Sequence, residues 1–376
     1  MPLGSSVWYG CTDPAYDGPA ALACQVQPTP PQTAAGLAAS YTSTFLNNFD
    51  QLTPENEFKM LWTEPEPGQF DFSVADQLVA FAQAHNMHVH GSALIYAAAN
   101  PSWVNDPLIP WTPLTLLATM RNHITTEITH FQSAYPGVVN EWDVVNEPFL
   151  DSGARDPNVY QQVIGNDWIA QAFWAAYEAD PNALLFLNEF NADTPDPRQQ
   201  AVLALVKQFV ATGVPIDGVG LEMHIGADGS YPTLAQLETV MGEYAALGLR
   251  VEVTELDVLK PVPDDGGATQ RAAYDTVAEA CREMTNCMSV TVWGVADQYS
   301  WRGVAQQATL FNTNFTAKPA YADVRCRLDD PRPATGPWTP KPCPTESSSL
   351  LAIGVTQPTG PTNGSSVASN VAPGAG

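Results

Sequence analysis

Two glutamates stand at the ends of apolar, β-like runs, Glu147 in the run 142–148 and Glu255 in the run 251–257. Two carboxyl groups can hydrolyse a glycosidic bond with retention, because one protonates the leaving oxygen while the other, ionised, attacks the anomeric carbon. This chemistry requires carboxyl groups roughly 5–5.5 Å apart. Since Glu147 and Glu255 are far apart in the sequence, the fold must bring distant strand ends together.

A repeating pattern of short and long segments indicates how this could happen. Short β-branched or aromatic runs alternate with longer Ala-, Leu- and Gln-rich segments of helical period, as in repeated βα units. We expect strands at 6–10, 48–52, 87–95, 140–145, 183–187, 217–223, 250–254 and 289–295. We expect covering helices at 74–84, 114–133, 167–178, 197–212, 233–247 and 268–284. The fold class predicted is α/β, a (β/α)8 TIM barrel, whose active site lies at the C-terminal strand ends. Glu147 then belongs to strand four and Glu255 to strand seven.

Composition changes after about Asp330, where Pro, Thr, Ser, Gly and Ala dominate. We therefore expect one catalytic domain at 1–329 and a disordered or extended linker or tail at 330–376. A formal net charge of −25 and a pI near 4.3 would repel nucleic acid and anionic lipid. No apolar run is long enough to span a membrane. A monomer acting on a neutral, polar polysaccharide or oligosaccharide fits this surface better.

Six cysteines form three couples that are local in sequence: Cys11–Cys24, Cys281–Cys287 and Cys326–Cys343. An even number of cysteines in local couples favours disulfides and a secreted or extracytoplasmic protein, although the first residues contain no secretory leader. His88 and His90 alternate on an expected strand, but no third ligand stands at a useful spacing. We therefore expect no metal site and no cofactor.

Read in order, six motifs resemble glycoside hydrolase family 10, the retaining β-1,4-xylanases. They are TPENEFK at 53–59, WDVVNEP at 142–148, LNEFN at 187–191, GVGLEMH at 218–224, TELD at 254–257 and TVWGVAD at 291–297. The resemblance covers about residues 5 to 325. Cys281 and Cys287 also lie where many members of this family carry a disulfide.

The resemblance implies a role for each matching residue. Glu147 would be the acid/base, kept protonated by limited solvation and neighbouring negative charge, and Glu255 the nucleophile. His224 and Asp257 would orient Glu255, and Asn146 would bind the sugar 2-hydroxyl. The substrate-binding residues would be Glu55, Asn56, Lys59, Tyr96, Asn188, Glu222, Trp293 and Trp301.

The third expected strand departs from the family pattern. Where members read Gly-His-Thr-Leu-Val-Trp-His-x-Gln, this chain has Ser92 and Ala97 for the histidines, Tyr96 for the tryptophan and Ala99 for the glutamine. Glu222 stands where an amide is usual. We expect a larger, more acidic site with fewer donors, slower turnover of ordinary xylan and a displaced pH optimum.

Three functions follow from these observations. The first is a retaining endo-β-1,4-xylanase-like hydrolase. The second keeps the same retaining chemistry but acts on a different or bulkier glycoside, because the reacting-sugar subsite is altered. The third is a barrel that binds carbohydrate without hydrolysing it, and the retention of Glu147, Asn146, Glu255, His224 and Asp257 together argues against it.

Overall fold

The computed structural model describes residues 1–7, 34–226, 228–330 and 343, without the side chains of 34–38. The chain divides into two units, Met1–Lys341 and Pro342–Gly376. The first unit contains every strand and helix described below, and Cys343 is the one described residue of the second.

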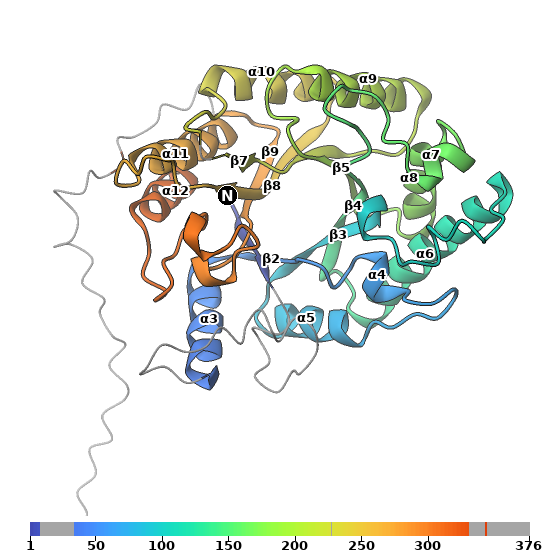
Figure 1. Ribbon diagram of the computed structural model, residues 1–376, viewed down its shortest axis with the longest axis horizontal. Helices are drawn as coiled ribbons and strands as arrows, with labels where there is room; N and C mark the ends of the chain where they lie inside the picture. Colours follow the sequence, from blue (N-terminus) through green and yellow to red (C-terminus); the bar gives the residue numbers. More distant parts are fainter. Residues whose placement is uncertain (8–33, 227, 331–342, 344–376) are drawn as a thin grey trace, which may run out of the picture. The chain divides into compact units, whose positions relative to one another are not determined.

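Parallel strands form a closed barrel in the first unit (Figure 1). Its eight strands are β1 (Leu3–Val7), β2 (Gln51–Pro54), β3 (His88–Tyr96), β4 (Val139–Asn146), β5 (Leu184–Glu189), β6 (Gly218–Leu221), β8 (Arg250–Val258) and β9 (Cys287–Val292). Pairing of β1 with β9 and of β6 with β8 closes the ring. The short β7 (His224–Ile225) also pairs with β8, just beyond β6. The predicted (β/α)8 barrel is confirmed.

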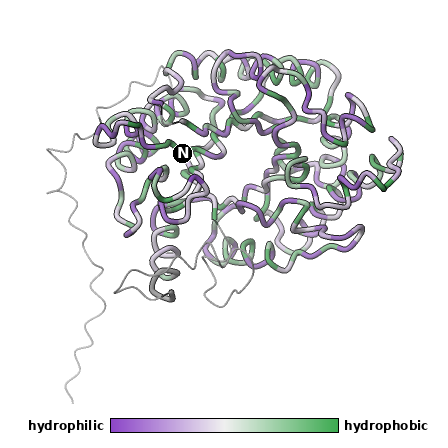
Figure 2. The backbone as a smooth tube through the Cα atoms, viewed as in Figure 1, coloured by the Kyte–Doolittle hydropathy of each residue, from purple (hydrophilic) through white to green (hydrophobic). Residues whose placement is uncertain are grey.

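Helices surround this ring, as Figure 1 shows. They are α3 (Ala34–Asn48), α4 (Met60–Thr63), α5 (Ser73–Ala84), α6 (Pro113–Ala134), α7 (Val159–Val163), α8 (Trp168–Ala179), α9 (Pro197–Thr212), α10 (Leu234–Ala245), α11 (Ala268–Glu283) and α12 (Pro319–Asp329). Three short 3-10 helices are η1 (Ala97–Ala99), η2 (Asp297–Tyr299) and η3 (Val304–Gln306). Figure 2 shows hydrophilic and hydrophobic residues alternating along the covering helices, as one buried face per helix requires.

Local sequence signals set several helix boundaries. Thr112 and Thr233 begin α6 and α10 with capping boxes, in which side chain and backbone amide satisfy one another. Asp196 caps α9, and Gly213 ends that helix in the left-handed conformation that glycine adopts without steric cost. These signals explain why the predicted helices lie within about two residues of the observed ones.

The first two strands differ from the prediction. Strand β1 begins three residues earlier than expected, and β2 begins at Gln51 rather than at residue 48. Residues up to Asn48 continue α3, whose Phe45 stacks on Phe49 just after the helix, and both rings are buried. Packing thus outweighed local strand propensity, and neither α3 nor α12 was predicted.

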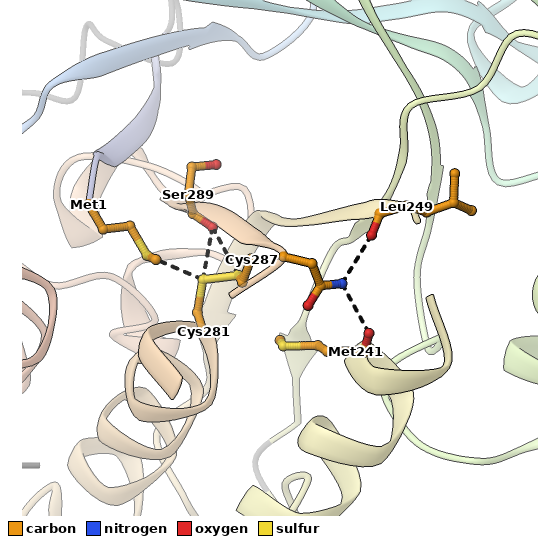
Figure 3. The surroundings of a disulfide bond; sticks show 7 residues. Met1, Met241, Leu249, Cys281, Cys287 and Ser289 are labelled. Atoms are coloured by element: carbon orange, nitrogen blue, oxygen red, sulfur yellow. Dashed lines mark hydrogen bonds between the residues drawn. A yellow bond between two sulfur atoms is a disulfide. The ribbon is translucent and has the colours of Figure 1, made fainter. Parts of the chain in front are cut away.

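Figure 3 shows the disulfide between Cys281 and Cys287, which joins the end of α11 to the start of β9. This predicted pair is confirmed. The predicted Cys11–Cys24 couple lies outside the described residues. Cys326 and Cys343 are each disulfide-bonded, and their pairing with one another stays a prediction. Within the part of the chain that the structure describes, no helix has the length and apolarity needed to cross a membrane.

Candidate active site

A cavity of about 220 Å³ lies at the C-terminal ends of the barrel strands. It is lined by Glu55, Asn56, Lys59, Tyr96, Asn146, Glu147, His224, Glu255, Trp293 and Trp301. All ten were predicted from the sequence as site residues. The other three predicted residues, Asn188, Glu222 and Asp257, are fully buried and contact the lining side chains from behind.

The backbone at Glu147 is held in an unusual conformation. Glu147 follows the last residue of β4 with φ +51°, in the left-handed region that non-glycine residues rarely adopt. Its amide donates to the carbonyl oxygen of Asn188 at 3.0 Å. Two residues later the amide of Phe149 donates to Glu189 Oε2 at 3.1 Å. Strand β5 therefore fixes the turn that directs Glu147 into the cavity.

Among the residues that the structure describes, one close hydrogen-bond donor contacts the carboxyl group of Glu147. Tyr96 Oη donates to Oε2 at 2.9 Å, while Asn146 Nδ2 lies at the 3.5 Å limit from Oε1. Burial raises the pKa of Glu147, the Tyr96 hydrogen bond opposes this rise, and the charge of Glu255 reinforces it. A raised pKa is what a general acid requires near neutral pH. Tyr96, predicted as a substrate contact, thus acts directly on the proposed acid.

Glu255 lies on β8, 7 % exposed, and faces two polar groups. Asn188 Nδ2 donates to its Oε1 at 3.0 Å, and His224 Nε2 lies 3.4 Å from its Oε2. These contacts come from β5 and β7, so side chains of two other strands orient one carboxylate. A fixed, hydrogen-bonded carboxylate beside the acid is suited to attack an anomeric carbon.

His224 connects Glu255 to a buried acidic residue. Its Nδ1 lies 3.0 Å from Asp257 Oδ2. Burial alone would lower the pKa of His224, but the charges and hydrogen bonds of Asp257 and Glu255 raise it to about 9. The imidazole is therefore positively charged at neutral pH and stabilises the Glu255 carboxylate.

Asp257 is itself held by two residues after β9. Trp301 Nε1 donates to Oδ2 at 2.8 Å and Arg302 Nε to Oδ1 at 3.0 Å. The Arg302 guanidinium also lies over the Trp301 ring, 4.4 Å from its centroid. Arg302 was not among the residues predicted from the sequence, although its position beside Trp301 was a usable signal. One face of Trp301 is thus covered by Arg302, while the side chain as a whole remains 53 % exposed.

Glu222 is a third carboxyl group in the site, and it is almost completely buried. Its Oε2 lies 3.5 Å from His224 Nε2, and its Oε1 accepts a hydrogen bond from Asn188 at 3.1 Å. Burial raises its pKa well above the usual range, and the charges of Glu255 and Glu147 raise it further. Its surroundings therefore favour the protonated form of Glu222.

Asn188 occupies the centre of this network. Its amide nitrogen lies within hydrogen-bond distance of Asn146 Oδ1 at 2.7 Å, Glu255 Oε1 and Glu222 Oε1. An amide group has two protons, so it cannot satisfy three acceptors at once. A proton on Glu222 resolves this shortage. Gly220 leaves the necessary space, since a Cβ there would lie 2.1 Å from Asn188 Oδ1.

Another wall of the cavity comes from the segment 55–59, between β2 and α4. Ser6 Oγ donates to Glu55 Oε1 at 2.9 Å, and Lys59 Nζ donates to Asn56 Oδ1 at 3.1 Å. Lys59 Nζ also lies 5.6 Å from the centroid of the Tyr96 ring. This wall offers a cation, an amide and a carboxyl group to sugar hydroxyls.

The altered strand-three motif contributes one residue, Tyr96, to the cavity lining. Ser92 is buried and forms a hydrogen bond with Asp143, and Ala97 and Ala99 belong to η1. Glu222, His224 and Glu255 each place one ligand-type atom within 4.8 Å of the others. Because Asn188 and Asp257 already satisfy these groups, the arrangement fits a hydrogen-bonded network better than a metal centre.

Comparison with known proteins agrees with this geometry. The model of the family described as glycosyl hydrolase family 10 matches residues 23–326. The chain belongs to glycoside hydrolase family 10. It is 37% identical to endo-1,4-beta-xylanase 5 of Pyricularia oryzae over 289 residues, which cover 75% of this chain and 70% of that protein. It is 36% identical to endo-1,4-beta-xylanase A of Phanerodontia chrysosporium, with 76% and 70% covered.

Solved structures lead to the same family. Xylanase 10B of Thermotoga maritima superimposes with a TM-score of 0.76 at 28% identity, covering 88% of this chain and 95% of that one. An intracellular xylanase of Thermoanaerobacterium saccharolyticum, in complex with xylotetraose, superimposes with a TM-score of 0.74 at 31% identity, covering 86% and 95%. The family 10 prediction is confirmed, and the protein is a glycosidase that acts on carbohydrate.

Proposed function

We propose that this family 10 enzyme is a retaining endo-β-1,4-xylanase-like hydrolase with Glu147 as acid/base and Glu255 as nucleophile. The observation that carries this proposal is that two carboxyl groups lining one cavity have different electrostatic surroundings. Burial raises the pKa of Glu147, whereas Glu255 faces the cationic ring of His224 and the Asn188 amide. One group is prepared to donate a proton, the other to attack.

The reaction proceeds in two displacements. Glu255 attacks the anomeric carbon while Glu147 transfers its proton to the departing glycosidic oxygen, and a glycosyl ester forms on Glu255. Glu147, now ionised, takes a proton from water, whose oxygen attacks the same carbon and releases Glu255. Both carboxyl groups return to their starting states, and the configuration at the anomeric carbon is retained.

The remaining site residues support these steps. Asn146, tied to Asn188 at 2.7 Å, binds the 2-hydroxyl of the reacting sugar. His224 and Asp257 hold the orientation and charge of Glu255. Hydroxyls of the neighbouring sugar bind Glu55, Asn56 and Lys59, and Trp293 and the open part of Trp301 provide apolar surfaces for sugar rings.

Digestion of xylan followed by proton NMR tests the proposal directly. The first reducing ends released must have the β configuration, because an inverting mechanism would release α anomers first. Aryl β-xyloside, β-glucoside and α-arabinofuranoside should be assayed in parallel, since Ser92, Ala97 and Ala99 leave the reacting-sugar subsite altered. A clear preference for a glycoside other than xyloside would overturn the substrate assignment, and absence of all product would overturn the enzyme assignment.

The Glu147→Gln variant distinguishes the acid from a structural residue. It keeps the shape of the side chain but cannot donate a proton, so hydrolysis of xylan should fall by about 10²-fold or more. Aryl xylosides with good leaving groups need less acid assistance and should lose much less in the glycosylation step. An equal loss on both substrates would contradict the role of Glu147.

We also propose that residues 1–329 form the catalytic domain, that 330–376 form a linker or tail, and that the protein is a secreted monomer. The disulfides support an oxidising compartment. Disulfide mapping by mass spectrometry would test Cys11–Cys24 and Cys326–Cys343, and sedimentation would test the monomer. A fully reduced protein purified from its native source would contradict secretion.

A further inference from the structure

A second histidine is surrounded by carboxyl groups inside the barrel, near the N-terminal ends of the strands. His90 lies at the third position of β3, Glu141 at the third position of β4, and Glu252 at the third position of β8. Asp143 lies one layer further along β4. Their exposed fractions are 2 %, 8 %, 2 % and 1 %. This group is at the opposite end of the strands from the cavity, and the proposed hydrolysis does not use it.

The distances around His90 are too long for directed charged hydrogen bonds on one side of the ring. Nδ1 lies 3.4 Å from Glu141 Oε1 and 3.2 Å from Glu252 Oε2. Charge-assisted N–H···O bonds measure about 2.7–2.9 Å. A single N–H at Nδ1 also cannot point at two carboxylates at once.

Some buried atoms of this group have no hydrogen-bond partner among the described residues. They include Glu252 Oε2 and Asp143 Oδ1, as well as His90 Nε2, although Nε2 lies 3.0 Å from Oδ1. Buried carboxylate oxygens are normally satisfied by donors. Glu252 Oε2 therefore lies within ion-pair distance of His90 Nδ1, at 3.2 Å, without a well-aligned hydrogen bond from the described residues.

The gaps match the spacing of ligands around a metal ion. Zinc bonds to nitrogen and oxygen are about 2.0–2.1 Å long, so two ligand atoms of a tetrahedral site lie about 3.3 Å apart. The two Nδ1 contacts, 3.2 and 3.4 Å, have this length. The ligand atoms of His90, Glu141 and Glu252 all lie within 4.8 Å of one another.

Charge in this part of the interior also favours a cation. The charged groups that act on Glu252 are Glu141, His90 and Asp143, so one imidazole faces three carboxyl groups. Even a protonated His90 would leave an excess of negative charge, which is costly away from water. A divalent ion would supply the missing positive charge.

We propose that His90 Nδ1, Glu141 Oε1 and Glu252 Oε2 bind a divalent transition-metal ion with the ligand preferences of Zn²⁺. One imidazole with two carboxylates suits zinc better than Ca²⁺ or Mg²⁺, which take oxygen ligands. Asp143 faces the other ring nitrogen, and Gln51 Nε2 donates to Glu141 Oε1 at 2.5 Å, as groups around metal ligands commonly do. The ion would join β3 and β4 to β8 and stabilise the barrel.

Zinc titration of the chelator-dialysed full-length protein tests this site. Calorimetry and elemental analysis should give one tightly bound Zn²⁺ per chain, and the midpoint of thermal unfolding should rise by about 3 °C or more. Glu252→Gln removes a charged ligand with little change in shape and should abolish both effects. Glu222→Gln is the matched control, because it changes the carboxyl–histidine group at the other end of the barrel and should retain both.

Absence of stoichiometric zinc, or equal zinc binding by Glu252→Gln and the parent, would overturn the proposal. Loss of binding in Glu222→Gln but not in Glu252→Gln would also overturn it, since the ion would then lie in the cavity. Because Glu252→Gln could fail to fold, Co²⁺ added to the parent provides a second test. The intense visible absorption of four-coordinate Co²⁺, removed by one equivalent of Zn²⁺, is expected, and its absence would count against the site.

Discussion

The two ends of this barrel each place a histidine among carboxyl groups, but they satisfy those groups differently. At the C-terminal end, His224 lies among Glu222, Glu255 and Asp257, and donors from Asn188, Trp301 and Arg302 complete the network. At the N-terminal end, His90 lies among Glu141, Asp143 and Glu252, with Gln51 and Ser92 as neighbouring donors. Clustered acids with many directed donors can hold defined proton states, whereas clustered acids with few donors are stabilised by a counter-ion or by taking up protons.

The largest expected effect on the hydrolysis rate comes from comparing two glutamates of β8, one at each end of the barrel. Glu255→Gln removes the proposed nucleophile and should lower the hydrolysis rate on xylan by at least about 10⁴-fold. Glu252→Gln, three residues earlier on β8, should retain most activity if it folds, because it does not line the cavity. Steady-state kinetics on both variants checks this. A loss of similar size in both would remove the functional distinction between the two ends.

The protonated state of His224 predicts how stability depends on pH. Its pKa is about 9 in the folded protein, against 6.5 for an unperturbed histidine. The resulting stabilisation is complete below about pH 6.5 and is lost as pH rises through 9, by up to about 3 kcal/mol. Urea unfolding at pH 6, 7.5 and 9 should show this decline, and His224→Gln should weaken it. An identical pH dependence in both proteins would contradict the ion pair with Asp257.

The Glu222→Gln variant tests whether the protonation state of this third carboxyl group affects the reaction. The charge of Glu147 raises the pKa of Glu222, and an electrostatic coupling of this kind acts on both members of the pair. In Glu222→Gln the alkaline limb of the kcat/KM profile should therefore move to lower pH. Superimposable profiles for the variant and the parent would show that Glu222 does not influence the acid.

Tyr96→Phe should have the smallest effect of the four. It removes the hydrogen bond that lowers the pKa of Glu147, so the alkaline limb should move to higher pH, with at most about a ten-fold change in rate. Tyr160→Phe is the control, since that hydroxyl donates to Asn100 instead. A shift of the same size in Tyr160→Phe would indicate a general effect of losing a buried hydroxyl group.

The sequence predicted most of the C-terminal end and little of the N-terminal end. Six contiguous motifs marked the strand ends and contain eight of the ten residues that line the cavity. The other two, Tyr96 and Trp301, were selected from the altered strand-three run and from a polar loop. Tyr96 was predicted only as a sugar contact. Its hydrogen bond to Glu147 joins two strands that are separate in the sequence, so the sequence did not reveal it. A metal at His88 and His90 was rejected because no third ligand stood at a useful spacing, and Glu141 and Glu252 lie far along the chain. Only barrel closure brings them within 3.4 Å of one imidazole.

The left-handed backbone conformation at Glu147 links catalytic activity to thermal stability. Any residue with a Cβ at φ +51° carries a steric penalty of about 1–2 kcal/mol, which glycine avoids. A glycine mutant at this position would therefore lose its proton donor yet melt at a higher temperature than the alanine mutant. The turn that positions the acid therefore lowers the stability of the fold. Selection for thermal stability alone would tend to replace Glu147 with glycine.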